Sequence, residues 1–336
     1  MRLSKVFALV VSGLVGVVAL STVGCDGGGD GQGGSGATGA TGGGGTGGGT
    51  GGSENPCDPA CDANAGIKSD CIAIVDNTDQ ESFGLRMSQL TLAKPAALTN
   101  AVVAGLIESG VTMNLKDCNL TGDGTFSWLM QFDTAGGKLK TGGAKPVADP
   151  TMGYCFVNET LGTTPVAPIT VDATLDADGK FSVMTGGDVV VPIFLGSETD
   201  YVLLPLRDAK LINVTVSADH NCIGKYNADK LLPADSCEPT AEVPRYTNAG
   251  TLDAYITLAD ADDVPISSLG QSLCVLLTGD PGDGGNPKKC SRDAMGKIVA
   301  KGDWCAATNT AGGCQDSLQV AGSFAASAVQ ITGDCP

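Results

Sequence analysis

The strongest constraint on the fold is a period-two alternation of apolar and polar residues in several separate segments. Phe126, Trp128, Met130 and Phe132 alternate with Ser127, Leu129, Gln131 and Asp133. Further segments repeat this pattern, at Ile169, Val171, Ala173 and Leu175, at Ile212, Val214 and Val216, and at Leu252, Ala254, Ile256 and Leu258. Side chains alternate between the two faces of a strand, so each segment predicts a strand with one buried face. We therefore expect a mainly β protein, an antiparallel β-sandwich or barrel-like body.

Smaller signals refine this expectation. The apolar phase shifts between Phe83, Leu85, Met87 and Leu90, Leu92, which predicts a β-bulge. The apolar run from Val189 to Leu195 contains Pro192, which favours an edge strand. Residues 176–179, Asp-Ala-Asp-Gly, lie between two strand patterns and predict a hairpin turn.

One or two short helices are expected beside the strands. Thr99 or Asn100 is suited to cap a helix that reaches Met113, with Val103, Leu106 and Ile107 on one face. A second helix is predicted from Ile266 to Leu277.

The cysteines add a second constraint, because 12 of the 13 remain once Cys25 is set aside. An even number of cysteines in an exported protein predicts disulfides. The candidates are Cys57, Cys61, Cys71, Cys118, Cys155, Cys222, Cys237, Cys274, Cys290, Cys305, Cys314 and Cys335. Loop length favours the pairs Cys222–Cys237, Cys274–Cys290 and Cys305–Cys314.

The N-terminus carries the evidence for export. Arg2 and Lys5 precede an uncharged apolar run from Val6 to Leu20, and Gly24 and Cys25 follow. A basic start, an apolar core and a small residue before a cut site are typical of a secretory signal. The segment resembles bacterial lipoprotein signal peptides, although Thr22 stands where that family usually has Leu. The resemblance implies cleavage after residue 24, lipidation (palmitate included) of Cys25 and a place in the cell envelope. Asp26 resembles an inner-membrane retention signal of some bacteria, and the outer membrane or cell surface is favoured.

A glycine-rich tract follows the lipidation site, with 17 glycines in the 26 residues from Gly27 to Gly52. Such a composition cannot bury apolar surface, so residues 25–53 are predicted to be a disordered linker. As a flexible coil the tract would span about 28 Å, and fully stretched about 90 Å. Residues 54–336 form the predicted disulfide-rich β domain.

The charge of the chain excludes one class of partner. The formal net charge is −17 at pH 7. Nucleic-acid binding depends on Lys and Arg that neutralise phosphates, so no nucleic-acid partner is expected. The same excess of acid opposes binding of the whole body to an anionic membrane surface.

Few residues suggest chemistry. The single histidine, His220, lies between a strand pattern and Cys222, which favours a turn residue over a catalytic base. Calcium is the one candidate cofactor, because Asp280, Asp283 and Asn286 offer hard oxygen ligands in a glycine-rich loop. Asp260, Asp262 and Asp263 crowd together in a run that favours a solvated face or a helix start. Trp304 is the candidate platform for a sugar, with packing on a disulfide as the alternative.

These observations predict a membrane-anchored, surface- or periplasm-exposed lipoprotein with a non-catalytic structural or adhesive β module. A calcium-dependent, lectin-like carbohydrate-binding domain is the alternative, and a glycoside-processing enzyme is the third hypothesis. The expected partners are the membrane, through the lipid, and a surface glycan or protein.

Overall fold

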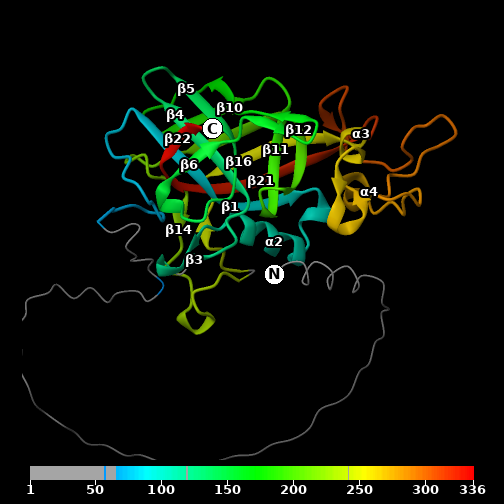
Figure 1. Cartoon of the computed structure of the whole chain (residues 1–336). Coiled ribbons are helices and arrows are strands. Elements are labelled where there is room, and N and C mark those ends of the chain that lie inside the picture. Colours follow the sequence, from blue (N-terminus) through cyan, green and yellow to red (C-terminus); the bar gives the residue numbers. More distant parts are fainter. Residues whose placement is uncertain (1–56, 58–65, 119, 241) are drawn as a thin grey trace, which may run out of the picture. The chain divides into compact units, whose positions relative to one another are not determined.

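The computed structural model divides the chain into two units, Met1–Glu54 and Asn55–Pro336. It describes residues 57, 66–118, 120–240 and 242–336, all within the second unit (Figure 1). The predicted signal peptide (1–24), the lipidation site Cys25 and the linker (25–53) lie outside these residues. None of the helices in the described ranges is long and apolar enough to cross a membrane.

Within the described ranges, one fourteen-stranded sheet dominates the fold. Its main path runs through β10 (Lys180–Met184), β12 (Asp200–Thr215), β16 (Gly250–Thr257), β21 (Ser317–Ala328), β1 (Ser82–Lys94), β4 (Ser127–Asp133), β5 (Lys138–Ala144), β6 (Tyr154–Phe156) and β22 (Ile331–Asp334). Five strands branch from it: β9 (Ile169–Asp172) on β5, β11 (Val189–Ser197) on β12, β13 (Cys222–Ile223) and β19 (Trp304–Cys305) on β21, and β20 (Thr310–Ala311) on β19. Every pair is antiparallel except β22 with β6. The expectation of a mainly β, largely antiparallel body is confirmed.

The sheet curls over, so that distant strands pack face to face as in a sandwich. Phe132 on β4 meets Phe181 on β10 edge-on, with ring centroids 5.3 Å apart. β4 and β10 are separated by four other strands in the sheet order. Both phenylalanines belong to the same buried apolar cluster, which forms the main core. A second cluster lies around β11, β16 and two short helices.

Four two-stranded sheets complete the strands of the described ranges. They pair β2 (Asn114–Leu115) with β3 (Leu120–Thr121), β7 (Glu159–Leu161) with β8 (Thr164–Val166), β14 (Lys225–Tyr226) with β15 (Tyr246–Thr247), and β17 (Pro265–Ile266) with β18 (Gln271–Ser272). Single 3-10 turns occur at Ala96–Leu98, Lys116–Cys118, Pro150–Met152, Pro233–Asp235 and Ser267–Leu269.

The predicted alternation is confirmed where one face of the strand meets water. On β16, Ala254 and Ile256 are buried while Thr251 is exposed. On β4 the alternation is incomplete, because Leu129 is buried as well as Met130. The segment from α2 (Ala101–Val111) to β3 contributes Val111 and Leu120 to the same cluster as Leu129, and so it covers the second face. The bulge expected in β1 is confirmed by a register shift between Met87 and Gln89.

The edge strand predicted around Pro192 is β11, which pairs with β12 alone. The predicted turn at residues 176–179 is present, since the Gly179 amide donates to the Asp176 carbonyl and Gly179 has φ +73°. The hairpin expected around it is wrong, because β9 pairs with β5 and β10 pairs with β12. The turn instead joins the two halves of the curled sheet.

The first predicted helix is α2, and the Asn100 side chain accepts a hydrogen bond from the Val103 amide, as a helix cap does. The second prediction is wrong in extent. A 3-10 turn and β18 interrupt it, and α4 (Leu273–Thr278) begins at the cap Ser272. Gly270 breaks the helix because it adopts the left-handed region at φ +60°. A third helix, α3 (Leu258–Asp262), has Asp260 in its first turn, in agreement with the helix start that the acidic run suggested.

Five disulfides join described cysteines: Cys57–Cys237, Cys71–Cys222, Cys155–Cys335, Cys274–Cys290 and Cys305–Cys314. Cys118 is also disulfide-bonded, while Cys61 lies outside the described residues. The predicted pairs 274–290 and 305–314 are confirmed. The predicted pair Cys222–Cys237 is wrong because Cys222 starts β13 on β21, beside the buried segment that carries Cys71.

A fully buried arginine, Arg86, lies on β1. Its guanidinium donates to the carbonyls of Met87 and Val111, at 3.0 and 2.7 Å, and to the hydroxyl of Ser127 at 2.9 Å. It also lies 5.4 Å from the centroid of the Tyr154 ring. The Val111 carbonyl belongs to the last turn of α2, where the helix dipole favours a positive charge. Arg86 therefore anchors α2 to the sheet.

Candidate functional site around Asp262

Asp262, the last residue of α3, is the one buried carboxylate among the described residues. The helix begins where β16 ends, and Thr257 caps it by accepting from the Asp260 amide at 3.0 Å. Ala261 and Leu258 pack into the second core cluster. Asp262 ends this short helix, and its side chain is 0% exposed.

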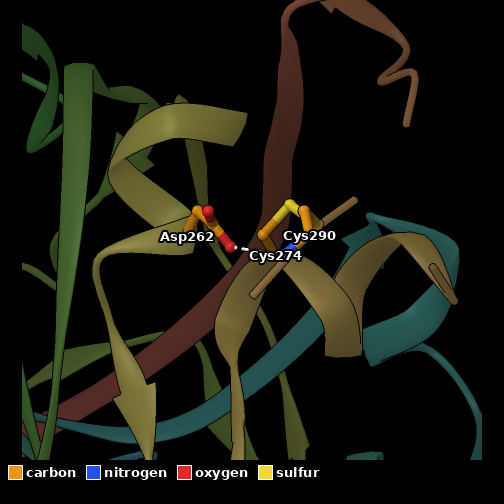
Figure 2. A group of neighbouring side chains, drawn as sticks. All are labelled: Asp262, Cys274 and Cys290. Carbon is orange, nitrogen blue, oxygen red and sulfur yellow. Dashed lines mark hydrogen bonds between the residues drawn. A yellow bond between two sulfur atoms is a disulfide. The ribbon is translucent and has the colours of Figure 1, made fainter. Parts of the chain in front are cut away.

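Both carboxylate oxygens of Asp262 are occupied by donors, and Figure 2 draws the bond from the Cys290 amide. Oδ1 accepts from the Cys290 amide at 2.7 Å and from the Ser272 hydroxyl at 2.9 Å, and Oδ2 accepts from Arg292 at 2.8 Å. Ser272 is also the cap of α4, since its Oγ accepts from the Val275 amide. A buried carboxylate is stable only with such partners. Asp262 therefore ties α3, the start of α4 and the segment after Cys290 to one point.

The Cys274–Cys290 disulfide lies beside this carboxylate, and Figure 2 shows the two cysteines next to Asp262. The three residues are close enough to form a three-ligand group, as are Cys305, Cys314 and Asp316. In both groups the two sulfur atoms are bonded to each other, whereas cysteine binds metal as the thiolate. The geometry of both groups fits cross-linking.

The neighbouring acids of α3 are partly exposed and serve different contacts. Arg207 of β12 donates two hydrogen bonds to the Asp260 carboxylate, from Nε at 2.6 Å and from Nη2 at 3.0 Å. Burial raises the pKa of the Asp260 carboxyl, but the hydrogen bonds from Arg207 and Thr257 outweigh burial and hold it below its usual range. Asp263 is exposed and pairs with Lys289 at 2.7 Å. The solvated face predicted for this run holds for Asp263, whereas Asp262 is buried.

The predicted calcium ligands lie in the loop that links α4 to Cys290. Asp280 Oδ1 accepts from the Gly282 and Ser291 amides, at 2.8 and 3.0 Å. Asp283 Oδ1 accepts from the Gly285 and Lys289 amides, at 2.9 and 3.0 Å. Both carboxylates thus shape the loop itself, and calcium binding by Asp280, Asp283 and Asn286 stays a prediction.

His220 lies at a turn with φ +59°, beside a shallow hollow. Its ring stacks on Phe83 with centroids 4.3 Å apart, and its Nδ1 lies 3.1 Å from the Gln80 carbonyl. Burial raises the pKa of the neighbouring Asp219 carboxyl. The hydrogen bonds from Ser217 and Asn221 outweigh burial and hold this pKa below its usual range. The hollow has a volume of about 250 Å³, and Asn77 and Phe83 are among its lining residues.

Trp304 stands half-buried at the start of β19, next to the Cys305–Cys314 disulfide, and its indole donates to Asn309 at 3.2 Å. The sequence therefore located the acidic loop, the histidine turn and this tryptophan, but missed Asp262 as a buried centre. One signal was present: Thr257-Leu-Ala-Asp260 matches a helix-capping pattern and predicts that a helix starts there. Nothing in the local sequence shows that Asp262 turns inward.

Comparisons with known proteins add no relative: no protein-family model, no curated protein and no solved structure matches this chain.

Proposed function

We propose that the protein is a lipid-anchored module of the cell envelope, held through Cys25, whose β body has a structural or adhesive role and no catalytic one. The anchor rests on the basic, apolar and small-residue order of the first 25 residues. The glycine-rich tract would let the body stand away from the membrane.

The observation that carries the non-catalytic part is the bonding of Asp262. A catalytic carboxylate needs at least one oxygen within reach of a substrate. The Asp262 side chain is instead fully buried, and its oxygens hold the Cys290 amide, Ser272 and Arg292. Asp219 likewise accepts from its neighbours Ser217 and Asn221. The bonds of Asp262 to three separate segments support a role in cross-linking a durable body.

The burial of the disulfides supports the same role. Cys71, Cys222, Cys274 and Cys290 are all buried, and disulfides stabilise exported domains that lack protection by the cytoplasm. A body cross-linked in this way suits a protein that stays folded on the outside of a membrane.

Detergent partitioning tests the anchor. The mature protein should enter the detergent phase of Triton X-114, and Cys25→Ala should move it to the aqueous phase. Ser53→Ala, a change outside the lipidation motif, is the matched control and should leave partitioning unchanged. If the Cys25→Ala protein still enters the detergent phase, the anchor is wrong.

A glycan array with and without EDTA tests the β body. A structural or adhesive module without calcium chemistry should give the same array signal in both conditions. A glycan signal that EDTA removes, and that Asp283→Asn also removes, would instead favour the lectin-like alternative.

A further inference from the structure

One segment has the opposite charge to the rest of the chain. Residues 288–301, which we name the Met295 arm, contain five cations (Lys288, Lys289, Arg292, Lys297 and Lys301) and one acid, Asp293. The whole chain has a formal net charge of −17. A strongly acidic protein that concentrates a quarter of its 20 cations in one short segment has a local site for anions.

The arm is an ordered hairpin. Arg292 and Ile298 form a bridge, and the Val299 amide donates to the Ser291 carbonyl at 2.9 Å. At the turn, Asp293 Oδ1 accepts from the Met295 and Lys297 amides, both at 2.9 Å. The base of the hairpin is clamped by the Cys274–Cys290 disulfide and by Asp262. In Figure 1 the orange loops project from the body beside α4.

An apolar side chain stands at the tip. Met295 is 87% exposed, the largest value among the large hydrophobic residues that are exposed, and Val299 is 57% exposed. Ile298, between them, packs partly against the second core cluster. Burial of a methionine away from water is favourable, so Met295 would gain free energy from a partner that covers it.

Three of the arm's lysines remain available to a partner. Lys289 pairs with Asp263, and Arg292 pairs with Asp262 and donates to the Gly296 carbonyl. Lys288, Lys297 and Lys301 make no ion pair with any described residue. All three are exposed.

We propose that the Met295 arm docks on the anionic headgroups of the membrane that holds the lipid anchor. Met295 would enter the boundary between headgroups and acyl chains, while Lys297 and its neighbours would reach the lipid phosphates. The proposal rests on the proposed function, because the anchor keeps the body within about 90 Å of that surface.

The acidity of the whole body does not prevent this contact. At physiological ionic strength the Debye length is about 8 Å, so the membrane senses the charges nearest to it. A projecting arm therefore acts through its own lysines. A convex tip with an apolar residue between cations fits a lipid interface. The acidic surface of a second copy would attract the lysines but would leave Met295 without an apolar partner.

Methionine oxidation provides the test, since a covered thioether reacts more slowly with peroxide. The lipidated mature protein is mixed with phosphatidylglycerol or phosphatidylcholine vesicles, and sulfoxide formation is followed by peptide mass spectrometry. Met152 and Met184, which are 75% and 63% exposed, are controls within the same molecule. Phosphatidylglycerol should slow oxidation of Met295 at least about fivefold, the effect of one lysine at an anionic surface. Both controls and the phosphatidylcholine sample should keep their rates.

Variants separate the arm from the anchor. Lys297→Glu with Lys301→Glu should abolish protection of Met295, whereas Lys225→Glu with Lys230→Glu, a matched change elsewhere, should not. In the Cys25→Ala protein, protection should persist at high vesicle concentration and vanish in 1 M salt. At low vesicle concentration the Cys25→Ala protein should lose protection, and if it is protected there as well as wild type, the anchor fails and the arm stands.

Three results would overturn the proposal. The first is an unchanged Met295 rate with phosphatidylglycerol while the protein is vesicle-bound. The second is equal protection by phosphatidylcholine, which would remove the role of the lysines. The third is protection that rises with protein concentration in the absence of vesicles, which would assign the arm to a second copy of the chain.

Discussion

Replacing Asp262 with alanine should cost the body a large share of its stability without touching its surface. The substitution removes the acceptor for three donors: the Cys290 amide, the Ser272 hydroxyl and the Arg292 guanidinium. The amide has no solvent route, because Cys290 is 1% exposed. The Arg292 side chain is 43% exposed and regains water.

The magnitude follows from these three contacts. An orphaned buried amide costs about 1–3 kcal/mol, and loss of the serine bond about 1 kcal/mol. The arginine bond, discounted because Arg292 is rehydrated, adds roughly 1 kcal/mol. The sum is about 4 kcal/mol, within the range of about 3–5 kcal/mol for breaking a buried pair. A domain of this size should then melt roughly 7 °C lower. Asp262→Asn keeps one acceptor oxygen and should cost about half as much.

Asp263→Ala is the matched control, since it removes the neighbouring carboxylate of an exposed pair whose side chains are 77% and 43% exposed. Such a pair contributes below about 1 kcal/mol. Urea unfolding of the three variants, followed by the fluorescence of Trp128 and Trp304 with disulfides intact, gives the free energies by linear extrapolation. If Asp262→Ala loses no more stability than Asp263→Ala, the carboxylate does not hold the three segments together.

Three further predictions concern cross-links, pH and metal. Removing the Cys71–Cys222 disulfide, with a sequence separation of 151, should lower the free energy of unfolding by about 5 kcal/mol in the chain-entropy limit. Removing Cys305–Cys314, with a separation of 9, should lower it by only about 2.5 kcal/mol. Equal losses in urea unfolding would contradict this expectation. Burial raises the pKa of the Glu108 carboxyl, and the opposing effect of Arg245 is smaller. The charged form of Glu108 therefore lowers the stability of the fold above its folded pKa, and this cost vanishes below about pH 4, where the carboxyl is protonated in the folded and the unfolded state. Glu108→Gln should therefore raise Tm at pH 7 but not at acid pH, and an unchanged Tm at pH 7 refutes this. If Asp280, Asp283 and Asn286 bind calcium, Tm should be higher in excess calcium than in EDTA; equal values would leave the loop a plain turn.

Features that depend on neighbouring residues were predictable from the sequence alone. The alternation of Ala254 and Ile256, the bulge in β1, the cap Asn100 and the turn at Asp176 each arise within a few residues. The disulfides Cys274–Cys290 and Cys305–Cys314 were predictable for the same reason, because a short loop brings its own ends together. The period of side chains along a strand does not depend on which strand becomes its partner.

Only the tertiary structure decided what these elements meet. Cys71 and Cys222 are 151 residues apart, and no local signal shows that Cys71 meets Cys222 where it pairs with β21. The turn after β9 looks like any hairpin turn, but it crosses between the halves of the sheet because β5 and β12 are the better-placed partners. Arg86 and Asp262 resemble surface charges in the sequence. They are buried because the fold brings the Val111 carbonyl to Arg86 and three donors to Asp262, and burial of a charge depends on such groups from other segments of the chain.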